Sequence, residues 1–91
     1  RVISVFKCHK ACPLTAASAI SVAAAVPGTV VRETVASQDA GSVRIGHPSG
    51  VMTMFPYLDD GTKPLEEIQV SGVAVQRTAR RIMDGTVYIQ R

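Results

Sequence analysis

The chain has 91 residues, 46% of them hydrophobic and 19% charged, and ten basic against seven acidic side chains give a net charge of +3. This length allows one domain and not two. The two cysteines are too few for a disulfide framework and fit a reducing, cytoplasmic compartment. The most apolar run, Ala16–Val26, is too short to span a membrane and too far from the N-terminus to be a signal peptide, and one arginine cluster with four aromatic residues does not make a nucleic-acid-binding surface.

The first third of the chain predicts a strand followed by a helix. The strand is Val2–Lys7, an apolar run that ends at a charge. The helix begins either with Thr15 as N-cap behind Pro13, or with Cys12 as N-cap and Pro13 at the first helical position. It extends to about Val26 and stops at Pro27-Gly28. Its residues at i, i+3 and i+4 spacing are small, so we expect protein to surround it closely; they are Ala16, Ala19, Ile20, Ala23 and Ala24.

The remaining two thirds predict antiparallel strands joined by turns. The predicted strands are Thr29–Ala36, Ser42–Gly46, Val51–Leu58, Glu67–Gln76 and Thr86–Gln90. Polar connections separate them at Ser37–Gly41, Asp59–Pro64 and Asp84–Gly85, and Arg77–Met83 forms a short helical turn or an irregular strand.

Two features inside these strands are specific. The turn His47-Pro48-Ser49-Gly50 makes a hairpin of its flanking strands, with Gly50 at positive φ. In the strand before it, Val43 and Ile45 face one side and Arg44 the other. Ser71-Gly72 indicates a bulge. The sequence thus predicts one small-residue helix wrapped by a curved antiparallel sheet, an α+β fold.

Few residues of the chain suggest chemistry. Cys8-His9-x-x-Cys12 has too few ligands and the wrong spacing for a structural zinc site, so no metal is expected. A helix N-terminus suits a carboxylate, and Thr15 lies at the predicted start, where it either contacts an anion or only caps the helix. The 47–50 turn shows no general-base partner. The arginine cluster either clamps a carboxylate or solvates the surface and pairs with acids such as Asp84; it comprises Arg77, Arg80 and Arg81.

The whole chain resembles the C-terminal domain of the PrpF family, which includes 2-methylaconitate cis–trans isomerase and 4-oxalomesaconate tautomerase. The matching segments are Cys8-His9-Lys10-Ala11 with Leu14-Thr15, the Ala-rich helix ending Pro27-Gly28-Thr29-Val30, Ile45-Gly46-His47-Pro48-Ser49-Gly50, and the stretch from Arg77 to Ile89. The last segment is the most specific.

The resemblance implies a fold like diaminopimelate epimerase, in which two similar domains each wrap a curved antiparallel sheet around a central helix. Residues 1–91 would then be the C-terminal portion, and the N-terminal domain lies outside them. The low charged share and the start at Arg1 also favour a piece of a longer protein. The helix start and the 47–50 turn would bind substrate carboxylates through Thr15, Ala16, Ser49 and Gly50.

The implied reaction moves a proton along an allylic system without metal or cofactor. The family's catalytic Lys and Cys belong to the N-terminal domain, so no catalytic role is assigned to Lys7, Lys10 or Cys8, and Cys12 is only a weak candidate.

The expected function is isomerisation of 2-methylaconitate-type acids in propionate metabolism, by a protein of which this chain alone is inactive. The alternatives are an oxalomesaconate-type tautomerase and a non-catalytic binding or scaffold domain. The expected partners are a small polycarboxylate and the N-terminal domain, and a homodimer is left open.

Overall fold

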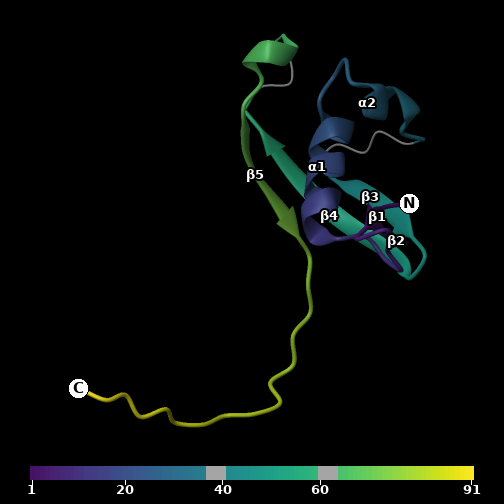
Figure 1. Ribbon diagram of the computed structural model, residues 1–91. Helices are drawn as coiled ribbons and strands as arrows, with labels where there is room; N and C mark the ends of the chain where they lie inside the picture. Colours follow the sequence, from purple (N-terminus) through teal and green to yellow (C-terminus); the bar gives the residue numbers. More distant parts are fainter. Residues whose placement is uncertain (37–40, 60–63) are drawn as a thin grey trace.

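A computed structural model describes residues 1–36, 41–59 and 64–91. It is an α+β structure in which a central helix, α1 (Leu14–Ala25), lies against one face of a three-stranded antiparallel sheet (Figure 1). A small hairpin precedes α1, a short helix follows it, and an extended C-terminal segment runs away from the body (Figure 1). The antiparallel sheet and central helix were predicted, but the described sheet has three strands and covers one face of α1.

The N-terminal segment is a hairpin rather than the predicted single strand Val2–Lys7. Strands β1 (Ile3–Ser4) and β2 (Lys7–Cys8) pair antiparallel across a turn at Val5 and Phe6. Both turn residues have positive φ, 51° and 64°, as a two-residue hairpin turn requires. The prediction was wrong because an apolar, β-branched residue at such a position gives no turn signal.

Helix α1 begins between the two predicted starts, one residue after the Cys12 alternative and two residues before the Thr15 alternative. Its N-cap is Pro13, so Thr15 and Cys12 are not caps, and no side chain caps the helix. The end at Ala25, followed by Gly28 at φ 89°, agrees with the prediction. The buried face is Ala17, Ser21 and Ala24. Of the predicted stripe Ala24 is buried, whereas Ala19 and Ile20 are exposed. Ser21 joins the core because its hydroxyl donates to the Ser18 carbonyl, 2.8 Å away.

Residues after the first helix form a second helix, α2 (Val30–Thr34), where a strand over Thr29–Ala36 was predicted. The Thr29 hydroxyl accepts from the Arg32 amide at 3.1 Å and so caps this helix. The cap outweighs the strand preference of the two valines. The predicted turn at Ser37–Gly41 lies mostly outside the described residues.

The main sheet has the order β3-β4-β5, with β3 (Val43–His47), β4 (Gly50–Leu58) and β5 (Val70–Val75) all antiparallel. The predicted hairpin at residues 47–50 is confirmed, with His47 paired to Gly50, and Gly50 has φ 141°. Along β3, Val43 and Ile45 are half-buried while Arg44 is exposed, as predicted. The predicted Asp59–Pro64 loop lies mostly outside the described residues.

Strand β5 is shorter than the predicted Glu67–Gln76, because a 3₁₀ helix over Leu65–Glu67 takes up the start of that range. A register shift pairs Tyr57 with Gly72 and Leu58 with Val70, which leaves Ser71 as the extra residue. The predicted bulge at Ser71-Gly72 is therefore confirmed.

The core is small and lies between α1 and the sheet. Met54 of β4, at 1% exposure, packs with Cys12 and Ala17, and partly buried side chains surround them: Val2, Ile45, Met52, Val73 and Val75. Every buried side-chain nitrogen or oxygen in the described part of the chain has a hydrogen-bond partner. No helix among the described residues is long and apolar enough to cross a membrane.

Residues 76–91 have no regular secondary structure and are exposed throughout (Figure 1). The predictions of a helical turn or irregular strand at Arg77–Met83, a turn at Asp84–Gly85 and a strand at Thr86–Gln90 were therefore wrong for this chain. The segment keeps strand-type residues, but no strand of the described chain pairs with it.

Candidate functional site

The segment before α1 and the β3–β4 turn are joined by one hydrogen bond. The Ser49 hydroxyl in the turn donates to the backbone carbonyl of Lys10, 39 residues earlier in the chain. The contact is exposed, so it lies on the surface and not in the core. It joins the turn that the sequence analysis named for ligand binding to the segment that leads into the predicted helix start.

Each of these two segments also contains a histidine that accepts a backbone hydrogen bond. His9 Nδ1 accepts from the Ala11 amide at 3.0 Å, and His47 Nδ1 accepts from the Ser49 amide at 3.2 Å. Both bonds run from a ring nitrogen to the amide two residues later. The His9 amide in turn donates to the Val2 carbonyl at 2.7 Å, which ties this segment to the N-terminal hairpin.

A pocket of about 120 Å³ lies beside this junction. Cys12 and His47 line it from the two segments, and Arg1 contributes a positive charge. The remaining lining residues are Val2, Ala11, Ile20, Ile45, Gly46 and Pro48. The pocket is therefore mostly apolar with a cationic edge, a combination that suits a small molecule with both a carboxylate and a hydrocarbon part.

The N-terminus of α1 follows directly after the pocket residue Cys12. No side chain caps the helix, and its first turn has no acidic residue. The first intrahelical bond runs from the Ala17 amide to the Pro13 carbonyl at 2.9 Å. The amides of Leu14, Thr15 and Ala16 precede it, in the position where a helix has no internal partner for its N–H groups. Thr15 is exposed, so an anion can reach this end from solvent.

The structure brings some of the predicted site residues together and leaves others apart. Ser49 and Gly50 lie in the turn that contacts Lys10, and Cys12 lines the pocket beside it. Thr15 and Ala16 lie in the first turn of α1, and within the described residues the link to the turn runs through Lys10 rather than through them. Cys12 is buried, and its sulfur lies 3.8 Å from the Pro13 carbonyl.

Sequence reasoning missed the two histidines, Lys10 and Arg1. The histidines were treated only as metal ligands or turn residues. The sequence carries no clear signal for their role, because almost any residue precedes a backbone amide by two positions and only the ring orientation shows which amides are bound. Among the described residues no group of three or more His, Cys, Asp or Glu side chains is arranged to hold a metal ion.

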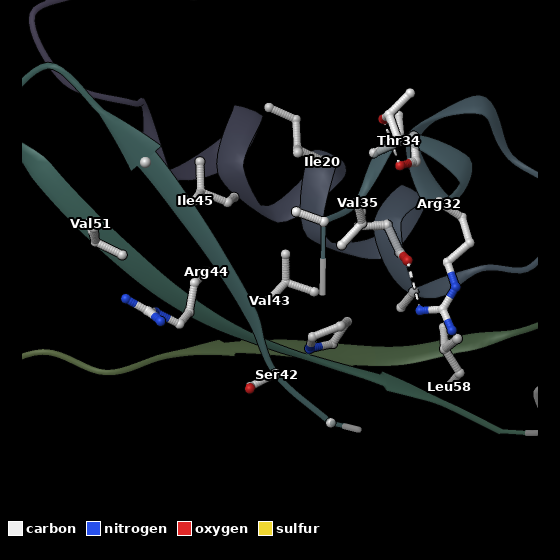
Figure 2. A pocket seen from close by; sticks show the side chains of 17 residues that line it. Ile20, Arg32, Thr34, Val35, Ser42, Val43, Arg44, Ile45, Val51 and Leu58 are labelled. Atoms are coloured by element: carbon white, nitrogen blue, oxygen red, sulfur yellow. Dashed lines mark hydrogen bonds between the residues drawn. The ribbon is translucent and has the colours of Figure 1, made fainter. Parts of the chain in front are cut away.

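A second, larger pocket of about 780 Å³ lies between the two helices and the sheet (Figure 2). Apolar side chains dominate its wall, among them Ile20, Val35, Val43 and Leu58. The Arg32 guanidinium at its edge donates to the Ala24 carbonyl at 3.2 Å (Figure 2). The two pockets share Ile20, Ile45 and Gly46, so together they follow α1 along β3.

The predicted arginine cluster lies elsewhere, in the extended C-terminal segment. Arg81 approaches Asp84 at 4.0 Å, and both side chains are more than 80% exposed. Of the alternatives left open for the three arginines, pairing with Asp84 is seen for Arg81. They do not line either pocket of the described chain.

Comparisons with known proteins identify a family. The model of the PrpF protein family matches residues 1–90. The chain is 39% identical over 84 residues to 3-methylitaconate isomerase of Eubacterium barkeri, covering 91% of this chain and 20% of that protein. It is 37% identical over 91 residues to 2-methyl-aconitate isomerase of Cupriavidus necator, covering 98% of this chain and 22% of that protein.

The isomerase of the same name from Shewanella oneidensis is 35% identical over 94 aligned positions, covering 100% of this chain and 22% of that protein. The chain therefore spans about a fifth of the length of the curated relatives that it matches. No solved structure matches it significantly.

Proposed function

The chain belongs to the PrpF family, and from this premise we propose that it is the C-terminal portion of a cofactor-independent isomerase of small unsaturated polycarboxylates. Its contribution is a carboxylate-binding surface that closes one side of the active site. The names of the relatives, isomerases of 3-methylitaconate and 2-methyl-aconitate, support this substrate class. The observation that carries the proposal is the bond between Ser49 and Lys10, because it joins the β3–β4 turn to the segment leading into the uncapped α1 N-terminus.

The proposed carboxylate contacts are backbone groups more than side chains. The amides of Thr15 and Ala16 at the α1 N-terminus donate to one carboxylate, favoured by the helix dipole. Ser49 and Gly50 contribute from the turn, with Gly50 at φ 141° leaving the backbone open to close approach. Both hydrogens that Ser49 can donate are engaged, the hydroxyl hydrogen by the Lys10 carbonyl and the amide hydrogen by His47 Nδ1, so a carboxylate binds the hydroxyl only when the bond to Lys10 opens.

The reaction consistent with this site is a proton shift along an allylic system. A base removes a proton from a carbon next to the double bond, the negative charge spreads to the carboxylate, and an acid returns a proton to another carbon. Fixed hydrogen-bond donors at the carboxylate stabilise that charge as it develops. In this proposal the acid–base pair belongs to the remainder of the protein, and Cys12, which lines the small pocket together with His47, is the candidate that this chain would contribute.

The proposed complete fold has two similar domains of the diaminopimelate epimerase type with the active site between them. In that arrangement further strands complete the sheet around α1, which agrees with the exposed side chains on the helix face away from the sheet. The proposed location is the cytoplasm, where free thiols such as Cys8 and Cys12 stay reduced.

The test uses the natural polypeptide that contains this chain, with its mass measured first under denaturing conditions. Isomerisation of 2-methylaconitate and of an oxalomesaconate-type acid is then followed by proton NMR. Turnover of the first supports the proposal, and preference for the second points to a tautomerase. No turnover of either by the full polypeptide would favour a scaffold and overturn the enzymatic proposal.

The carboxylate contact has its own test, the substitution Thr15→Asp compared with its neutral isostere Thr15→Asn. A negative charge in the first turn of a helix stabilises the helix, but it repels a bound carboxylate. At a few ångströms and an effective dielectric near 20 this repulsion is several kcal/mol, so we expect KM to rise about tenfold or more. If Thr15→Asp leaves KM equal to that of Thr15→Asn, the α1 N-terminus does not face the substrate.

A further inference from the structure

We propose that His9 and His47 are positioning residues that hold the carboxylate site in shape as neutral imidazoles, each with its proton on Nε2. The role of the site rests on the proposed function, but the protonation state of the rings does not. The proposal rests on two hydrogen bonds that backbone amides donate to ring nitrogens, at 3.0 Å for His9 and 3.2 Å for His47.

The direction of these bonds fixes the tautomer. A backbone amide can only donate, so the ring nitrogen that faces it must present a lone pair. In both histidines that nitrogen is Nδ1, and a neutral ring then carries its proton on Nε2. A doubly protonated ring has no acceptor and would lose the bond. Both rings are half-buried, which favours one fixed orientation.

The two imidazoles act on adjoining atoms of one junction. His47 holds the amide of Ser49, and the hydroxyl of the same residue donates to Lys10. Lys10 lies between His9 and the Ala11 amide that His9 holds. Each ring thus closes a turn on its own side, and the Ser49–Lys10 bond joins the two turns.

Loss of one ring acceptor has a defined consequence. Without His47 Nδ1 the Ser49 amide is released, and the turn no longer places the hydroxyl against the Lys10 carbonyl. The pocket beside the junction changes with it, because His47 and Ala11 both line that pocket. The same geometry, a side-chain acceptor bound to the amide two residues later, is the one that asparagine makes in an Asx turn.

The experiment therefore compares His47→Asn, which keeps an acceptor of the right reach, with His47→Ala, which removes it. Long-range ¹H–¹⁵N spectra of the 91-residue chain report the tautomer of each ring. Temperature coefficients of the Ser49 and Ala11 amide shifts report whether those amides are hydrogen-bonded.

Titration with trans-aconitate, a small unsaturated tricarboxylate, is followed at the amides of Thr15 and Ala16. Ser71→Ala is the matched control, since it removes a similar exposed hydroxyl-to-backbone bond, to Tyr57, elsewhere.

We expect the Nε2–H tautomer in both rings and a bonded Ser49 amide in the wild type and in His47→Asn. In His47→Ala the Ser49 amide becomes solvent-bonded and trans-aconitate binds roughly two- to tenfold more weakly, the range for one lost hydrogen bond. Ser71→Ala leaves both readouts unchanged. The Nδ1–H tautomer, or His47→Asn behaving like His47→Ala, overturns the positioning role. Failure of the wild type to bind trans-aconitate, with tautomers as expected, counts against the carboxylate site alone, and the amide readout then decides the positioning role.

Discussion

Thr29 joins the two helices through a single hydroxyl group. Its oxygen accepts from the Arg32 amide at 3.1 Å, and its hydrogen points to the carbonyls of Ala23 and Val26. We expect Thr29→Val, which keeps the shape and removes both functions, to lower the free energy of unfolding by about 1–2 kcal/mol, as loss of a helix cap does. Urea unfolding followed by circular dichroism measures it.

Thr34→Val is the matched control for this prediction. The Thr34 hydroxyl makes one exposed bond back to the Val31 carbonyl at 2.9 Å and caps nothing. Its loss should change the unfolding free energy by less than about 0.5 kcal/mol. Equal effects of the two substitutions would mean that the Thr29 cap does not stabilise the helix junction.

The candidate residues were named from residue types, whereas the hydrogen bonds around them are visible only in the fold. The Thr15 region and the Ser49 turn were both named from sequence, and the turn is hydrogen-bonded to Lys10 in the segment before α1 rather than to Thr15. The roles of His9 and His47 depend on which ring nitrogen faces the backbone, and that follows from side-chain rotation and not from residue order. Thr15 was expected at the N-cap, but Pro13 takes that position because its fixed φ and extended ψ already suit it.

The N-terminal hairpin is strained in its turn, and this can be tested. Val5 and Phe6 have φ of 51° and 64°, a region that costs an L-residue roughly 1–2 kcal/mol each and is worst for a β-branched side chain. Both side chains are exposed, Phe6 at 99%. We therefore expect the double substitution Val5→Asn and Phe6→Gly, the residues favoured in such turns, to raise the thermal midpoint of the chain.

The control for the hairpin is Ile3→Asn with Ser4→Gly, which places the same two residues in strand β1, outside the turn. It should lower or leave unchanged the midpoint measured by differential scanning calorimetry. If the substitution at Val5 and Phe6 also fails to stabilise, the tight turn is not the conformation of this segment in solution.

The helix and strand ends that the sequence predicted correctly are those marked by turn-forming residues. The end of α1 at Pro27-Gly28 and the β3–β4 hairpin both rest on residues with restricted or special backbone geometry. The predictions were wrong where a local hydrogen bond outweighs the secondary-structure preference of the residues. Val30 and Val31 favour a strand, but the cap by Thr29 makes them helical. In α1 nearly every side chain is small, so spacing alone could not distinguish the face with Ala17 and Ser21 from its neighbour.

The dimensions of the whole molecule reflect its C-terminal segment. The radius of gyration is 17.4 Å, whereas a compact chain of this length has about 12 Å. Sequence alone predicted a final strand at Thr86–Gln90, and a strand needs a partner edge that the described residues do not supply. The low charged share of the chain has its counterpart in this segment, which exposes five large apolar side chains by more than 80% each: Ile82, Met83, Val87, Tyr88 and Ile89.

Truncation after Gln76 tests the role of that segment in the isolated chain. Since residues 77–91 are exposed throughout, we expect the free energy of unfolding to change by less than about 0.5 kcal/mol. Self-association in sedimentation velocity should fall, because the exposed apolar surface is removed. The full-length double substitution Val87→Ser and Ile89→Ser is the control, since it reduces apolar surface at constant length and should also reduce association. A truncated chain that is destabilised by more than about 1 kcal/mol would show instead that the segment folds back on the sheet and contributes to its stability.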